Sequence, residues 1–155
     1  MPITLMTLMD HHERLDALFA EHREALVGLD LDRAKERLEV WSRALFAHME
    51  HEEKRILPRY ASLPKVRGGG VDFFLGEHQR LRERIAEVKE RLDPLDPTTP
   101  GLKARVVDLF DRLALLRGIV EHHDLRERQL LYPRLDEATT EDERRALLEG
   151  APAPP

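Results

Sequence analysis

Helix breakers divide this chain into four long segments, and that division constrains the fold more than any other feature. Gly28 closes the first segment, residues 62–70 contain one proline and three glycines, and residues 94–101 contain three prolines. The sequence between them predicts helices over residues 4–28, 31–60, 71–92 and 101–137, a short helix over 140–149 and a frayed tail over 151–155. At 155 residues the chain is long enough for one domain with its own core, which we expect over residues 1–150.

Each long segment carries a stripe of apolar residues at alternating steps of three and four, the spacing of helices packed in a bundle. In the third segment the stripe consists of Val71, Phe74, His78, Leu81, Ile85, Val88 and Leu92. Because the links between segments are short, successive helices should run antiparallel. The chain is therefore predicted to be all-α, an antiparallel up-down-up-down four-helix bundle.

Charge distribution and the lack of cysteine narrow the functions. Acidic and basic residues are interleaved at a formal net charge of -5, so we expect no basic face for nucleic acid or a membrane surface. No apolar run approaches the roughly 20 residues that cross a bilayer, and the first residues do not resemble a secretion signal, so a cytoplasmic protein is expected. Without cysteine, a metal can be held only by histidine and carboxylate.

Histidines interrupt the apolar stripe in every segment, and they form a repeat. His48 and His123 are each followed by glutamate four residues later and by proline ten residues later. His12 and His78 occupy matching positions near the starts of the first and third segments. Two helix pairs thus present the same side chains in the same order, as pseudo-twofold halves.

The spacing of these residues can bring them to one layer of the bundle. Residues four apart lie on one face of a helix, so each His-x-x-x-Glu pair can point both side chains at one centre. At ~1.5 Å per residue, His12 and His78 lie about 10 Å inside the starts of their helices. The two His-x-x-x-Glu pairs lie at a similar distance from the ends of their helices. The candidate metal ligands are His12, His48, Glu52, His78, His123 and Glu127.

Burying four imidazoles and two carboxylates would cost several kcal/mol per unpaired ion. A pair of divalent metal ions removes this cost, and imidazole with carboxylate suits iron, manganese or zinc. Two other metal-binding patterns do not fit. Ferritin-like di-iron proteins need Glu-x-x-His, and no histidine here has glutamate three residues before it; the zincin motif His-Glu-x-x-His is absent as well.

This ordered ligand set resembles the hemerythrin-like, HHE cation-binding domain over about residues 4–137. The resemblance implies two iron ions, replaceable by zinc or manganese, with an oxygen species bridging them. It assigns His12 and His48 to one iron and the remaining two histidines to the other. Both glutamates, Glu52 and Glu127, act as bridges in this assignment.

Two departures separate the chain from the oxygen-carrying hemerythrins. Those proteins have two histidines four apart on the third helix, whereas Phe74 and Arg82 stand four residues from His78 here. Their second bridging carboxylate is an aspartate five residues after the fourth-helix histidine, where this chain has Arg128. Both departures resemble the bacterial hemerythrin-like branch, so dedicated oxygen transport is not expected. The lack of cysteine argues against the branch that repairs iron–sulfur clusters.

The other histidines are expected outside the metal layer. His11 and His122 each precede a chosen ligand and lie ~100° around the helix from it, yet either could replace its neighbour. His51 is expected at the surface or behind the ligands. His22 lies roughly 15 Å from His12 along the helix, too far to share its centre.

Three polar residues near the ligands are also assigned no direct role. Glu53 follows a ligand and is expected to be solvated. Tyr60 and Tyr132 are expected to anchor helix ends by packing, with hydrogen bonds toward the site as the alternative. The loop at residues 65–70 is expected to be a mobile surface loop, with gating of the site as the alternative.

Three functions fit these features. The first is binding or sensing of a small molecule, dioxygen, nitric oxide or peroxide, at open coordination positions on the two irons. The second is an enzyme that turns over peroxide or nitric oxide at the same irons. The third is a metal-stapled structural protein or an iron-responsive interaction module. Iron as the metal depends on the family resemblance, because the spacing alone does not distinguish it from zinc or manganese.

Overall fold

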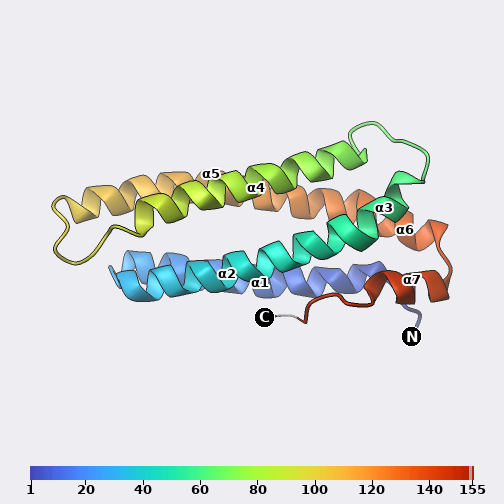
Figure 1. The fold of residues 1–155 in the computed structure, drawn as a ribbon, viewed down its shortest axis with the longest axis horizontal. Coiled ribbons are helices and arrows are strands. Elements are labelled where there is room, and N and C mark those ends of the chain that lie inside the picture. Colours follow the sequence, from blue (N-terminus) through green and yellow to red (C-terminus); the bar gives the residue numbers. More distant parts are fainter. Residues whose placement is uncertain (154) are drawn as a thin grey trace.

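Four long helices run the length of the molecule in the computed structural model, which describes residues 1–153 and 155 (Figure 1). They are α1 (Met9–Val27), α2 (Leu31–His51), α4 (Val71–Leu92) and α5 (Leu102–Arg126). Helix α1 packs against α2 and α5, and α4 packs against the same two helices. Neighbouring helices are antiparallel, and the described residues contain no strand, so the predicted all-α bundle is confirmed.

Shorter helices extend this bundle at the end where the N-terminus lies (Figure 1). They are the 3-10 helix η1 (Leu5–Leu8), α3 (Leu57–Ala61), α6 (Tyr132–Ala138) and α7 (Glu141–Leu148). Helix α7 is the short helix predicted over residues 140–149, and Thr140 and Glu143 cap its start reciprocally. The predicted tail at 151–155 includes residue 154, which lies outside the described residues. No described helix is both long and apolar enough to cross a membrane.

The second and fourth long segments are not the continuous α-helices that were predicted. Each contains a five-residue π-helical turn, η2 (Glu52–Ile56) and η3 (Glu127–Leu131). In both, the amide after the turn donates to the carbonyl of the glutamate that begins it, five residues back. Pro58 and Pro133 follow one residue later, and a proline lacks an N–H and crowds the carbonyl four residues before it. The wider π turn accommodates both effects without ending the helix.

A polar layer separates two apolar clusters along the bundle. The larger cluster extends toward the α1–α2 and α4–α5 turns and includes Trp41 and Leu81. The smaller cluster fills the other end and includes Phe74 and Leu131. Burying each such side chain contributes about 1.5–3 kcal/mol. Because both clusters draw on all four long segments, they fix the height of the polar layer between them.

Candidate metal centre

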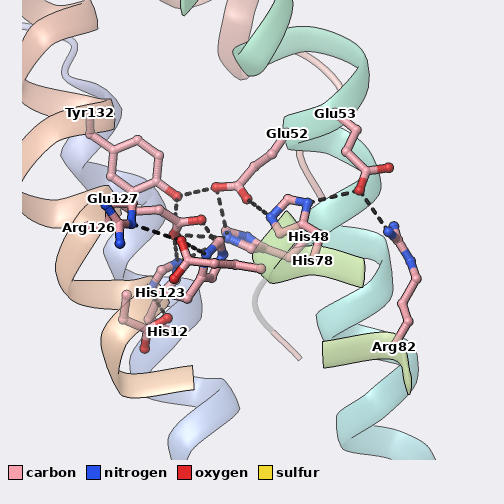
Figure 2. Close-up of polar contacts among 12 residues, drawn as sticks. His12, His48, Glu52, Glu53, His78, Arg82, His123, Arg126, Glu127 and Tyr132 are labelled. Carbon is pink, nitrogen blue, oxygen red and sulfur yellow. Dashed lines mark hydrogen bonds and ion pairs between the residues drawn. The ribbon is translucent and has the colours of Figure 1, made fainter. Parts of the chain in front are cut away.

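The polar layer contains all six predicted ligands, one histidine from each long helix and a glutamate from the start of each π turn (Figure 2). None of the six is more than 4% exposed. Their potential donor atoms form two groups in which all atoms lie within 4.8 Å of one another. These groups are His12, His48, Glu52 and Glu127, and Glu52, His78, His123 and Glu127. The structure therefore pairs the histidines and shares the glutamates as the resemblance implies; we call the set the six-residue centre.

Each glutamate of the centre uses its two oxygens for different histidines. Glu52 Oε1 lies 3.2 Å from His48 Nε2, and Glu52 Oε2 lies 3.2 Å from His78 Nε2. In the same way, Glu127 Oε2 lies 3.0 Å from His12 Nε2, and Glu127 Oε1 lies 2.6 Å from His123 Nε2. Each carboxylate thus spans from one histidine pair to the other, which is the placement of a bridging ligand.

Several of these buried atoms face each other without forming a hydrogen bond. They are Nε2 of His78 and His123, Oε2 of Glu52 and Oε1 of Glu127. A buried polar atom left unsatisfied costs roughly 1–3 kcal/mol. Ligand atoms that converge on a cation have this arrangement, close together without a donor aimed at an acceptor. The donor set of imidazole nitrogen and carboxylate oxygen fits iron, manganese or zinc.

The two carboxylates of the centre need nearby positive charge. Burial opposes the charged form of His12, but Glu127 and Asp124 raise its pKa to about 10. Burial opposes charge on His48 too, and its glutamate neighbours raise its pKa to about 10. Burial likewise disfavours the Glu127 anion, yet the adjacent imidazoles hold its pKa well below the usual range. The carboxylates therefore stay ionised, and either protons or metal cations supply the balancing charge.

Glu53 supports the centre from behind while its side chain is 27% exposed, so the prediction that it would be solvated holds only in part. Its Oε1 accepts a hydrogen bond from His78 Nδ1 at 2.9 Å and pairs with Arg82 at 2.9 Å. The residue lies ~100° around the helix from its neighbour Glu52. That direction faces α4, which packs against α2, at the partly exposed edge of the bundle.

Two further carboxylates, which the sequence did not single out, face Nδ1 atoms. Asp124 Oδ1 lies 3.0 Å from His12 Nδ1, and Glu77 Oε1 lies 3.6 Å from His123 Nδ1. A carboxylate behind an imidazole fixes the ring orientation and keeps the proton on Nδ1, which leaves Nε2 for a metal. Glu77 and Asp124 are each next to a histidine of the centre in the sequence. Acidic residues are so frequent in this chain that this position alone does not predict a role for them.

Tyr132 also lies at the centre, contrary to the prediction that it only anchors a helix end. Its hydroxyl is 2.5 Å from Glu52 Oε1 and 3.1 Å from Glu127 Oε2, and the side chain is fully buried. In an α-helix, a residue five positions after Glu127 would lie about 140° away from it. The π turn η3 brings Tyr132 back to the same face. By contrast, the Tyr60 hydroxyl donates to the Gly69 carbonyl, outside the centre.

The remaining histidines lie outside both groups of potential ligands. His11 is buried, but its ring centroid is 5.7 Å from that of His48. His122 Nε2 lies 2.8 Å from the side chain of an α5 arginine. His22 is buried in the larger apolar cluster, where its Nδ1 lies 2.7 Å from a carbonyl of α2. His51 is buried as well, rather than at the surface.

A helical bundle with a buried layer of four histidines and two shared glutamates defines a cation-binding class of helical protein. Comparison with protein families agrees, because residues 4–135 match the hemerythrin HHE cation binding domain. The chain belongs to this family, and a metal cation is the ligand that the family and the six-residue centre indicate. Neither a curated protein nor a solved structure matched the chain.

Proposed function

We propose that the protein holds two iron ions in the six-residue centre and binds dioxygen, nitric oxide or peroxide there. The observation that supports this proposal most is the sharing of both glutamates between two groups of potential ligands. Each group offers two imidazole nitrogens and two carboxylate oxygens, and non-haem iron sites of this type keep open positions for a small ligand. Iron would supply reversible electron transfer to such a ligand.

The surrounding residues favour binding in a dry, oriented site. The two apolar clusters lie on either side of the polar layer and exclude water from it. Burial and the two neighbouring carboxylates hold the pKa of Tyr132 well above its ordinary value, so its phenol stays protonated and acts as a hydrogen-bond donor. The carboxylates behind the imidazoles serve orientation rather than proton transfer to a substrate.

Metal analysis and an optical spectrum of the freshly purified protein test this proposal. We expect two irons per chain and a visible oxo-to-iron band that disappears on anaerobic reduction and returns in air. His78→Gln should abolish the band, and His122→Gln, whose ring lies outside both groups, should preserve it. Zinc-filled protein without a visible band, even after reconstitution with iron, would refute the proposal.

Turnover of peroxide or nitric oxide is the second candidate function. The Tyr132 hydroxyl favours it, because a neutral hydrogen-bond donor beside the centre can stabilise negative charge that develops on a bound small molecule. Steady-state assays of the iron-loaded protein distinguish turnover from binding. Rates equal to those of free iron, or unchanged by His78→Ala, would exclude it.

A further inference from the structure

The six-residue centre is nearly symmetric, but the support behind its imidazoles is not. We call His78 and His123 the α4–α5 half of the centre, and His12 and His48 the α1–α2 half. The two halves use the same glutamates, so any difference between them must come from the residues that hold the rings in place.

In the α4–α5 half, a carboxylate lies behind each imidazole, and an arginine holds each carboxylate. The hydrogen bond from His78 Nδ1 to Glu53 Oε1 is 2.9 Å long, and Arg82 Nη1 lies 2.9 Å from the same oxygen. Arg82 and His78 both lie on α4. The same helix therefore carries the imidazole and the arginine that holds Glu53 against it.

Behind the second imidazole of this half, His123, lies Glu77, which is 1% exposed. Glu77 Oε1 is 3.6 Å from His123 Nδ1, so the contact is an ion-pair distance without an aligned hydrogen bond. Arg126 Nε donates to Glu77 Oε1 at 3.0 Å. The same guanidinium donates through Nη1 to the Gly68 carbonyl and lies 5.2 Å from the centre of the Phe73 ring. Arg126 is therefore held on three sides, which leaves Glu77 little freedom to turn away from the imidazole.

The α1–α2 half has weaker support. Asp124 Oδ1 lies 3.0 Å from His12 Nδ1, and this nitrogen, like His123 Nδ1, has no aligned hydrogen bond. Among the described residues, no arginine or lysine lies within ion-pair distance of Asp124, and no carboxylate lies within that distance of His48 Nδ1. The nearest ring to His48 outside the centre is that of His11, with centroids 5.7 Å apart.

The repeat in the sequence explains the difference. When His78 is aligned with His12, Glu77 matches His11. Four residues after His78 stands Arg82, and the matching position in α1 is Asp16. Helix α4 thus supplies a carboxylate and an arginine where α1 supplies an imidazole and an aspartate.

We propose that the α4–α5 half binds the first metal ion and the α1–α2 half binds the second, with Glu53 and Glu77 as positioning residues. This inference rests on the proposed function only in that the six-residue centre must bind metal. Loss of a carboxylate behind a metal-binding imidazole typically lowers metal affinity about 10–100-fold. The α4–α5 half has one imidazole that is hydrogen-bonded to a carboxylate through Nδ1, and arginines hold both of its carboxylates. The α1–α2 half has no such hydrogen bond and one carboxylate that no arginine holds, so the two binding constants should differ by about tenfold.

One effect opposes this order. The charge of Asp124 is not neutralised by an arginine and attracts a cation toward the α1–α2 half. Asp124 is 20% exposed, however, and water screens that attraction. The Glu53–Arg82 pair is 27% and 35% exposed, but it acts by orienting His78 through a short hydrogen bond rather than by a net charge. Glu77 behind the other imidazole is 1% exposed, so ring orientation decides the order.

A zinc titration of the metal-free protein, followed by NMR of ¹⁵N-labelled histidine rings, tests the proposal. The first equivalent of zinc chloride should shift the signals of His78 and His123, and the second should shift those of His12 and His48. Single His→Gln variants assign the signals. If all four shift together, or the α1–α2 pair shifts first, the proposed order is overturned. A protein that takes up no zinc, manganese or iron overturns the proposed function as well, which separates the two failures.

Variants of the supporting carboxylates test the cause of the order. Glu53→Ala should lower the first binding constant about 10–100-fold, and Glu53→Gln should recover part of the loss because its amide oxygen can still accept from His78 Nδ1. Asp124→Asn should weaken only the second step. Glu50→Gln, on the same helix and paired only with Lys54 at the surface, should change neither. An unchanged first constant in Glu53→Ala, or an equal loss in the Glu50 control, would show that Glu53 is not a positioning residue.

Discussion

Replacing Tyr132 by phenylalanine removes one hydroxyl from the six-residue centre and leaves the ring in place. The hydroxyl lies 2.5 Å from Glu52 Oε1 and 3.1 Å from Glu127 Oε2, and the side chain is fully buried. A hydrogen bond to a charged group contributes roughly 1.5–3 kcal/mol, and the phenol has one proton to donate. Tyr132→Phe should therefore lower the free energy of unfolding of the metal-free protein by about 2 kcal/mol.

Thermal and urea unfolding followed by circular dichroism measure this loss. In a protein of this size, 1 kcal/mol corresponds to about 2–4 °C in melting temperature, so the variant should melt about 4–8 °C lower. The loss should be smaller in the metal-loaded protein, because a bound cation draws negative charge away from both carboxylates and weakens their hydrogen bonds to the phenol.

Two controls connect the loss to the carboxylates. Tyr60→Phe also removes a buried hydroxyl, which donates to the neutral Gly69 carbonyl at 2.6 Å and accepts from the partly exposed Arg134 guanidinium at 3.0 Å. This hydroxyl donates to no carboxylate, so a loss of about 1 kcal/mol is expected. A double-mutant cycle of Tyr132→Phe with Glu52→Gln should give a coupling energy of about 1–3 kcal/mol. A coupling below about 0.5 kcal/mol, or an equal loss in Tyr60→Phe, would refute the conclusion that the phenol acts on the charged centre.

Three further predictions concern the metal, the pH and the loop before α4. Chelation should lower the melting temperature by about 8–16 °C, since a ligand at 1,000 times its dissociation constant stabilises the native state by about 4 kcal/mol; an unchanged value would contradict a metal that joins the two apolar clusters. The pKa values of His12 and His48 are about 10 in the folded metal-free protein against 6.5 in the unfolded chain, so their contribution is present below pH 6.5 and is lost as the pH rises through 10. Urea titrations at stepped pH should show this slope for the metal-free protein and not for the metal-loaded protein, whose imidazoles are neutral. Gly69→Ala should cost about 1–3 kcal/mol, because an added Cβ would lie 2.7 Å from Val66 Cγ2; Gly76→Ala, whose Cβ would meet no atom within 4 Å inside α4, should instead stabilise the protein by up to about 1 kcal/mol.

Periodicity made the bundle and the six residues of the centre predictable. A stripe at steps of three and four reports which face of a helix is buried, and a histidine on that stripe must lie at the height its position dictates. Those two facts depend only on helix geometry. They brought His12, His48 and the other four side chains to one layer without knowledge of the loops.

The π turns were not predictable in the same way. A proline within a helical pattern shows that the backbone must change, but the same signal is expected whether the helix ends, kinks or widens. Pro58 and Pro133 follow turns that widen, and this outcome decides where the next residues point. Tyr132 was expected to pack because it lies near a helix end. In an α-helix it would point away from Glu127, whereas the π turn brings it back.

The pseudo-twofold repeat describes the six-residue centre and fails in the residues around it. Tyr132 precedes Pro133, and the matching residue before Pro58 is Leu57, so a phenol enters the centre from one side only. Glu53 supports an imidazole where its counterpart is Arg128. Residues that must hold the same kind of ion are constrained to be alike in both halves, since each needs the same donor atoms. Residues behind the ligands are not constrained to be alike in both halves. By orienting the imidazole rings and hydrogen-bonding to them, they can make two chemically identical ligand sets differ in metal affinity.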